Sequence, residues 1–201
     1  MSGGSASGEL FTQAELFAGS AADSANSAAA RTSAPAVPNA GKPLKSEIVV
    51  YTDGGCSGNP GAGGWACVII DEEAAKLGIA PKDECFSGGE KLTTNNRMEL
   101  SAVICALSQI IKKPYNSSRP VCVFTDSQYV KNGISTWING WKRKGWKTAS
   151  GGAVKNQDLW QQLDQLNSSL NVEWRWVKGH AGIKYNEICD SLCQKEIAKY
   201  R

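Results

Sequence analysis

The order of apolar and polar residues changes near Glu47, and from there to the C-terminus each pattern predicts one kind of element. Two apolar runs, "IVVYT" and "WACVII", are typical of strands, and "ECFSGGEKL" is expected to form a third. Apolar residues at helical spacing then predict a long helix, while "PVCVFT" is the near-continuous apolar run of a strand covered on both faces. The expected strands are 47–53, 64–71, 84–92, 120–126 and 171–178, and the expected helices are 94–112, 127–139, 156–168 and 185–199.

This order of elements defines the expected fold class. Three strands, a helix, a strand, further helices, a strand and a last helix predict an α/β domain with a mixed sheet. A chain of 201 residues is long enough for one ordinary domain with a sizeable core and too short for two comfortable ones. We therefore expect one domain over residues 46–201.

Residues 1–45 have a different composition, because they are rich in Ala, Ser and Gly and carry prolines near their end. This composition predicts a disordered tail. The exception is "ELFTQAELFA", which could form a short docking helix or only a frayed turn without function, and we favour the turn. No basic start is followed by an apolar stretch, which argues against a secretory signal.

Composition narrows the class of protein. Hydrophobic residues make up 41% of the chain and charged residues 20%, and no run approaches the roughly 20 apolar residues of a membrane span. Seven cysteines without a CxxC pair, together with a single histidine, make a poor zinc site. We expect reduced thiols, mostly buried, in a reducing compartment, and hence a cytoplasmic protein. We also expect a monomer without membrane contact.

Asp53 ends the first apolar run in "YTDGGCSGNPGAGGW", and a glycine-rich segment follows it. A phosphate-binding loop would need a GK[ST] ending, which is missing. A calcium loop would need a side-chain ligand where Gly55 stands and a closing glutamate where Gly64 stands. A hairpin explains the glycines without explaining the acid. Asp53 alone could be a solvated turn residue or a metal ligand.

Three further acids occupy comparable positions. Asp126 follows the "VCVFT" strand, where it could simply cap the next helix. Glu99 lies in the first turns of the long helix, where the helix dipole alone would favour it, and Asp190 lies in the last helix. Each acid has an ordinary structural interpretation, yet acids at strand ends can meet at one edge of a sheet, where α/β folds bind ligands.

Electrostatics limits what such a group of acids can be. Two carboxylates 4 Å apart repel by roughly 4 kcal/mol at an effective dielectric constant of about 20. Clustered acids therefore raise one another's pKa values unless cations lie between them. Hard oxygen ligands in an open site suit Mg²⁺ or Mn²⁺, and a pair of such ions can promote in-line displacement at a phosphodiester. The spacing of the acids leads to this hypothesis and no further.

Four ordered motifs carry a resemblance to a known family. "YTDGGCSGNPGAGGW", "TTNNRMEL", "FTDSQYV" and "WVKGHAGIKYNEICD" resemble the motifs of type 1 ribonuclease H, and the resemblance covers residues 47–201. It implies a ribonuclease H-like fold, a five-stranded mixed sheet flanked by helices. It also implies an endonuclease that uses two Mg²⁺ ions, or Mn²⁺ in their place, to hydrolyse the RNA strand of an RNA–DNA hybrid.

The resemblance assigns roles to single residues. It implies that the metal ions are held by Asp53, Glu99, Asp126 and Asp190. It also implies that His180, in a loop between Gly179 and Gly182, aids proton transfer or product release. Without the resemblance, His180 would be interpreted as a structural residue. The glycines after Asp53 would let the backbone approach the RNA strand. The implied substrate-groove residues are Cys56, Asn59, Asn95, Asn96 and Gln128, and Thr94 would contact a phosphate of the DNA strand.

Aromatic and basic residues alternate in "WINGWKRKGWK". The segment could be a solvated charged face above buried tryptophans, or a surface for a nucleic-acid backbone. It resembles the basic protrusion of bacterial-type ribonucleases H, which grips the DNA strand of the hybrid. The residues that would make these contacts are Trp137, Lys142, Arg143, Lys144 and Lys147.

The expected products are 5′-phosphate and 3′-hydroxyl ends, and the expected cellular substrates are replication primers and R-loops. One departure from the family pattern is Ile183-Lys184-Tyr185, which replaces a more polar, proline-containing stretch. Two other functions stay open at this point. A hybrid-binding module without catalysis would gain nothing from four mutually repelling acids, and a transposase or junction nuclease would lack the "TTNNRMEL" and "KGHAG" motifs.

Overall fold

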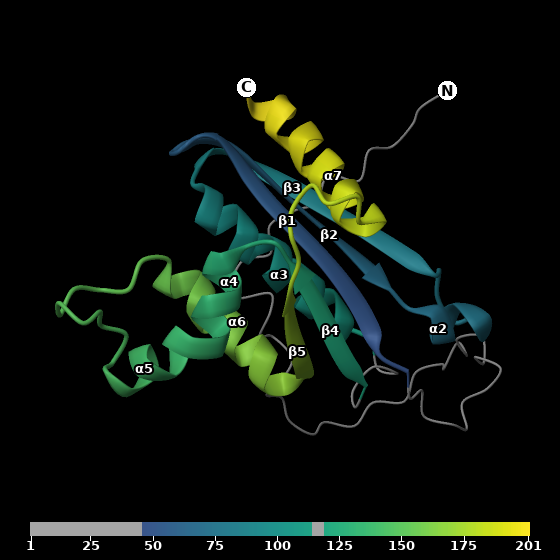
Figure 1. The fold of residues 1–201 in the computed structure, drawn as a ribbon, viewed down its shortest axis with the longest axis horizontal. Coiled ribbons are helices and arrows are strands. Elements are labelled where there is room, and N and C mark those ends of the chain that lie inside the picture. Colours follow the sequence, from purple (N-terminus) through teal and green to yellow (C-terminus); the bar gives the residue numbers. More distant parts are fainter. Residues whose placement is uncertain (1–45, 114–118) are drawn as a thin grey trace, which may run out of the picture. The chain divides into compact units, whose positions relative to one another are not determined.

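Five strands form one mixed sheet in the order β3-β2-β1-β4-β5 in the computed structural model, which describes residues 46–113 and 119–201 (Figure 1). β1 pairs antiparallel with β2 and parallel with β4, β2 pairs antiparallel with β3, and β4 pairs parallel with β5. The strands are β1 (Ile48–Gly58), β2 (Gly61–Ile70), β3 (Asp83–Thr93), β4 (Pro120–Thr125) and β5 (Asn171–Trp176). The helical segments are α2 (Glu72–Lys76), α3 (Asn95–Ile111), α4 (Gln128–Asn132), η2 (Gly133–Trp137), α5 (Ile138–Arg143), α6 (Gln157–Ser169) and α7 (Lys184–Tyr200).

The sequence predicted this α/β class, the five strands and the long helices, and the structure confirms them. The predictions for residues 1–45, including the disordered tail, lie outside the described residues. The short helix α2 was missed, because a five-residue helix has too few turns to show a period. Its start is nevertheless marked by Asp71, whose side chain accepts a hydrogen bond from the Ala74 nitrogen at 2.9 Å.

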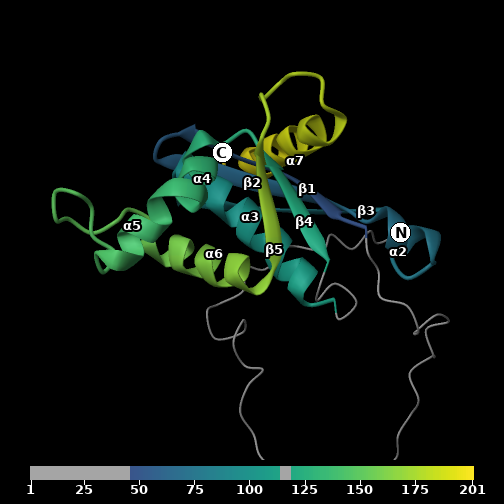
Figure 2. The ribbon, with the colours of Figure 1, turned by 60° about the horizontal axis from the view of Figure 1, so that its bottom comes forward.

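Helices cover the two faces of the sheet unequally. α3 and α6 lie on one side and α7 lies on the other (Figure 2). Ile48 and Val50 of β1 pack with Leu107 of α3 in the larger core, whereas Val68 of β2 packs with Cys193 of α7 in a smaller one. Because side chains alternate across a strand, each of the central strands β1 and β2 feeds both cores.

α7 packs on β1, β2 and β3, and beyond it the same face of the sheet carries a row of stacked side chains. The rings of Tyr51 on β1 and Phe124 on β4 stack with centroids 4.9 Å apart, and these two residues are direct partners in the parallel ladder. The Arg175 guanidinium of β5 lies 5.5 Å from the Phe124 centroid, and the Tyr185 ring flanks Tyr51 at 5.8 Å. This row continues the packing on this face of the sheet from Tyr185 at the start of α7 to the edge strand β5.

The prediction that the first strand ends at Asp53 is wrong. β1 continues through the glycines to Gly58 and forms a long hairpin with β2 around Asn59 and Pro60. Several of these glycines make room for helices. A Cβ on Gly54 would lie 2.3 Å from the Glu99 nitrogen of α3, and one on Gly64 would lie 2.5 Å from the Cys193 oxygen of α7.

The helix predicted over 127–139 is also longer than expected. It begins as α4, passes through a π-helical turn, η2, and ends as α5 at Arg143. Ile134 within this turn and Ile138 just after it are both buried in the larger core. At its start Gly133 meets the buried Trp160 ring so closely that a Cβ would lie 2.0 Å from it.

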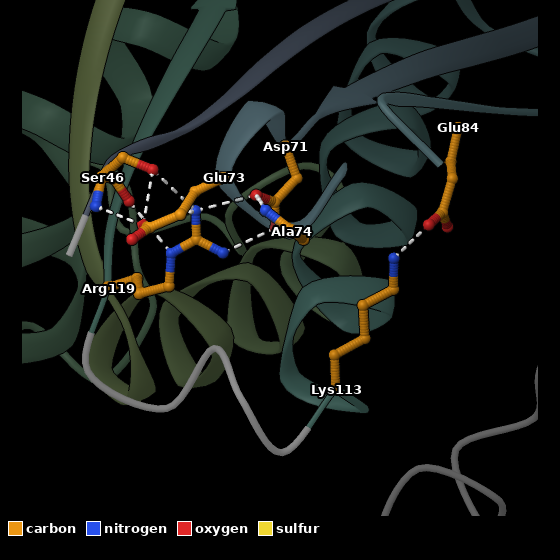
Figure 3. A network of polar contacts seen from close by, with 7 residues as sticks. All are labelled: Ser46, Asp71, Glu73, Ala74, Glu84, Lys113 and Arg119. Carbon is orange, nitrogen blue, oxygen red and sulfur yellow. Dashed lines mark hydrogen bonds and ion pairs between the residues drawn. The ribbon is translucent and has the colours of Figure 1, made fainter. Parts of the chain in front are cut away.

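A buried arginine joins three segments at the end of the sheet where β1 begins (Figure 3). The Arg119 guanidinium donates to both Asp71 oxygens, at 2.6 and 2.9 Å, and its Nε donates to the Ser46 carbonyl at 2.9 Å. Ser46 in turn donates from its nitrogen and its hydroxyl to Glu73, each at 2.8 Å. Arg119 is 1% exposed, so its charge depends on these partners.

All seven cysteines lie in the described part of the chain as free thiols, and four of them are buried, as the sequence predicted. Cys189 and Cys193 of α7 are both fully buried in the smaller core. Among the described residues, no helix combines the length and hydropathy that crossing a bilayer requires.

We predict that Arg119→Met lowers the free energy of unfolding by about 3–5 kcal/mol, because it leaves the buried Asp71 carboxylate without its main partner. Urea unfolding followed by circular dichroism measures the change. Lys82→Met is the matched control, because Lys82 pairs with Glu72 on the surface and its loss should change stability little. Equal stability of Arg119→Met and the wild type would contradict this account of the ion pair.

Candidate active site

Two of the predicted acids are brought together by one close approach of backbone. Asp53 lies in the middle of β1, and Glu99 lies in the second turn of α3. Gly54 follows Asp53 and touches the α3 backbone at Met98 and Glu99. The Gly54 nitrogen donates to Asp53 Oδ1 at 2.9 Å and so fixes that carboxylate. Any residue with a Cβ at position 54 would push α3, and Glu99 with it, away from Asp53.

The third acid, Asp126, follows β4 directly, as predicted. The parallel ladder of β1 and β4 ends at the pair Thr52 and Thr125, so Asp53 and Asp126 are each the next residue along neighbouring strands. The carbonyl of Asp126 accepts from the Trp176 indole at 3.0 Å. Gly179 lies against the carboxylate, since a Cβ there would be 2.7 Å from Asp126 Oδ2.

The remaining two predicted residues belong to the C-terminal part of the site. Asp190 lies on α7, and His180 lies in the loop between β5 and α7. His180 Nδ1 is 3.7 Å from Asp190 Oδ2, and the imidazole is exposed. The backbone of His180 has φ of 53°, a left-handed conformation that costs a non-glycine residue roughly 1–2 kcal/mol. Such backbone outliers concentrate at functional sites.

Burial and mutual repulsion act on these acids in the same direction. Burial raises the pKa of Asp53 to about 6, with repulsion from Asp126 and Asp190 adding to the shift. Burial likewise raises the pKa of Glu99 to about 7, with Asp126 and Asp53 contributing, although hydrogen bonds from Ser127 and Asn95 oppose the shift. Burial also raises the pKa of Asp126. The ionised cluster is therefore destabilising in the protein alone.

A divalent cation would relieve this repulsion, and the chemistry of the donors fits one. All four acids offer hard oxygen ligands of the kind that Mg²⁺ and Mn²⁺ prefer. Within the described ranges, no three acidic, histidine or cysteine side chains already form a metal-binding cluster. Both Glu99 oxygens instead accept hydrogen bonds, from Asn95 Nδ2 at 2.8 Å and from the Ser127 hydroxyl.

Two residues next to the acids were missed by the sequence analysis. Ser127 is buried, donates to Glu99, and caps α4 by accepting from the Val130 nitrogen at 3.1 Å. Asn186 of α7 is 3% exposed and hydrogen bonds to the Asp126 carboxylate, which opposes the rise in the pKa of Asp126. The "TDS" and "YNEICD" stretches contain both residues, but nothing in their spacing separates them from ordinary cap and helix residues.

The predicted groove residues fall into two groups. Those from the hairpin and the start of α3 are connected: Asn59 Oδ1 accepts from the Asn95 nitrogen at 3.3 Å, and the Cys56 thiol donates to the Gly61 and Thr93 carbonyls at 3.3 and 3.4 Å. Thr94 precedes α3 as its N-cap residue, and Asn96 is exposed in its first turn. Asn95 thus joins this groove to Glu99. Gln128 is separate from it, exposed at the start of α4.

The basic segment, which we define as residues 137–147, begins at the end of η2 and includes α5 (Figure 1). Trp137 is 39% exposed, whereas Trp141 packs on the buried Trp160 with centroids 5.4 Å apart. The basic side chains of the segment are all exposed, and one of them, Lys142, is paired with Asp164 of α6 at 2.7 Å. The exposed basic residues are Lys142, Arg143, Lys144 and Lys147.

The sheet order, the helices on both faces and the acids gathered around β1 and β4 define a ribonuclease H-like fold. Solved structures agree. LC9-RNase H1, a type 1 RNase H with the type 2 active-site motif, aligns with a TM-score of 0.65 and 32% identity over 80% of this chain and 76% of that chain. LC11-RNase H1 in complex with an RNA/DNA hybrid aligns with a TM-score of 0.56 and 22% identity, over 76% of this chain and 97% of that one, and supports the fold alone.

The chain belongs to the RNase H family, whose family model matches residues 45–198. Ribonuclease H of Treponema denticola is 50% identical over 74% of this chain and 98% of its own length. Ribonuclease H of Chromobacterium violaceum is 52% identical over 75% of this chain and 94% of its own. The family resemblance drawn from the sequence motifs is thereby confirmed.

We predict that Asp53→Asn stabilises the metal-free protein at alkaline pH. The carboxyl ionises near its ordinary pKa of 3.8 in the unfolded chain and near 6 in the folded one, so the wild type loses stability as pH rises through this window. Asparagine removes this loss, which is about 2–3 kcal/mol for a shift from 3.8 to about 6.

Urea unfolding in EDTA at pH 5 and pH 8 tests the prediction. The stability gain of Asp53→Asn should be larger at pH 8. Glu187→Gln, which removes an exposed acid of α7, serves as the control and should leave the pH dependence unchanged. A gain that is absent at pH 8, or larger at pH 5, would show that folding does not raise the pKa of Asp53.

Proposed function

We propose that this chain is a ribonuclease H that hydrolyses the RNA strand of RNA–DNA hybrids and leaves 5′-phosphate and 3′-hydroxyl ends. Membership of the RNase H family supports the reaction class, and relatives at about half identity carry the name Ribonuclease H. LC11-RNase H1, which shares this fold, is solved in complex with an RNA/DNA hybrid, and we propose the same substrate class for this chain. The observation that carries the proposal is geometric: the close approach at Gly54 places Asp53 of β1 beside Glu99 of α3, and Asp126 follows the neighbouring strand at the same level.

In this proposal four acids share one role, which is to hold two Mg²⁺ ions, for which Mn²⁺ can substitute. These acids are Asp53, Glu99, Asp126 and Asp190. Bound there, the ions would supply activation of water and stabilisation of the leaving oxygen. To hold an ion, Glu99 would have to give up hydrogen bonds that its two oxygens accept from Asn95 and Ser127. His180, exposed beside Asp190, moves a proton at the reacting phosphate or assists product release.

In this proposal the groove residues and the basic segment bind different parts of the substrate. The hairpin and α3 groove, with Gln128, contacts 2′-hydroxyls and bases in the minor groove, and Thr94 contacts a phosphate of the DNA strand. The basic segment contacts further phosphates of that strand. We propose that the enzyme acts as a cytoplasmic monomer without membrane contact, on replication primers and R-loops.

We predict cleavage of labelled RNA in a hybrid when Mg²⁺ is present, and no cleavage with EDTA. Double-stranded RNA and double-stranded DNA should stay intact under the same conditions. Asp126→Asn should lower kcat by about 10²-fold or more, because charge stabilisation worth several kcal/mol depends on the ligand. Glu187→Gln should cleave normally. Hybrid binding without cleavage would identify a binding module, and cleavage of double-stranded DNA would identify another nuclease of this fold.

We predict that replacing Lys142, Lys144 and Lys147 together by alanine flattens the salt dependence of hybrid affinity. Each lost phosphate contact lowers the slope of log K against log salt by about 0.9, so three contacts give at most a change of about 3. Because Lys142 is already paired with Asp164, restoring it should recover less than restoring Lys144.

Titrating hybrid affinity against salt for the wild type and the variants measures the slopes. Lys82→Ala, at the far end of the sheet beside α2, is the control and should keep the wild-type slope. Unchanged slopes in the triple variant would remove the basic segment from substrate binding.

A further inference from the structure

Trp176 ends β5 with 46% of its surface exposed, and among the large apolar residues of the described part of the chain only Leu92, at 73%, is more exposed. Two residues earlier on the same face, Trp174 packs against the larger core, and its indole donates to Asn167 at 2.9 Å. On this face of β5, Trp174 is therefore packed against the core, whereas Trp176 is open to solvent. An exposed indole at this place offers an apolar surface on which a ligand can pack.

The exposed indole is held in a fixed place beside the candidate active site. Its Nε1–H donates to the Asp126 carbonyl at 3.0 Å, and the adjoining Val177 nitrogen donates to the Thr125 carbonyl at 3.0 Å. The ring thus lies next to the residue whose carboxylate is a candidate metal ligand. It also directly precedes the loop that carries His180, which lies four residues further on. A rigid aromatic surface loses little side-chain entropy when a ligand packs on it.

We propose that Trp176 is a substrate-contacting residue whose indole packs against the sugar surface of the RNA strand close to the cleaved phosphate. A ribose offers apolar C–H groups to such a ring, and the flanking phosphates need cations nearby. Lys178, two residues further on and exposed, supplies one. Gln128, exposed at the start of α4, lies two residues after Asp126 and borders the same region. This contact extends the substrate surface to β5, and it rests on the proposed ribonuclease H function.

The contact should affect substrate binding rather than chemistry, and it should not depend on salt. Trp176→Ala removes the ring, and we expect KM for the hybrid to rise about tenfold while kcat stays within about twofold. Trp176→Phe keeps an aromatic surface but loses the donor to Asp126, so its KM should stay within about threefold of the wild type. Leu77→Ala removes another exposed apolar side chain, beside α2, and is the control.

Steady-state cleavage of the hybrid by the full chain with Mg²⁺, at about 50 and 200 mM salt, is the test. The proposal requires the same KM ratio between Trp176→Ala and wild type at both salt concentrations, because an apolar contact releases no counterions. It is overturned if Trp176→Ala leaves KM unchanged. It is equally overturned if both variants lower kcat at constant KM, since the indole would then act only by holding the Asp126 carbonyl. A wild type without hybrid cleavage would instead reject the proposed function.

Discussion

The close packing of α3 on β1 at Gly54 is the constraint on which the candidate site depends. Since backbone atoms of Met98 and Glu99 occupy the space that a side chain at position 54 would need, only glycine allows the two elements to meet. That meeting places a helix carboxylate next to a strand carboxylate. The same hairpin admits α7 on the opposite face through Gly64, so small residues of two strands determine where acids from two helices lie.

Bringing these acids together opposes folding, and the rest of the domain offsets that cost. Two cores pack the central strands from both sides, and the Tyr51–Phe124 row covers part of the sheet beyond α7. Ser127 and Asn186 donate hydrogen bonds to the carboxylates without neutralising them. The site is thus held in position while its charge stays unbalanced, which is the condition under which a cation binds most favourably.

Much of the fold and of the candidate site could be predicted from the sequence, and the predictions that failed did so for physical reasons. The apolar runs located all five strands, and the ordered motifs singled out Asp53, Glu99, Asp126 and Asp190 as candidate metal ligands. The end of β1 was misplaced because glycines usually mark turns, whereas here they serve the approach of helices that no local pattern shows. The π-helical turn, the hydrogen bonds of Ser127 and the exposure of Trp176 depend on contacts between segments distant in the chain, which local periodicity does not encode.

The Arg119 network has a mechanical consequence for the domain. Ser46 is tied to Arg119 and Glu73 before the chain enters β1, at the end of the sheet remote from the hairpin. A force applied through the preceding residues would first load these charged anchors, and Asp53 lies seven residues further along. The domain should therefore tolerate fusion, tethering or immobilisation through its N-terminal side without distortion of the acidic cluster.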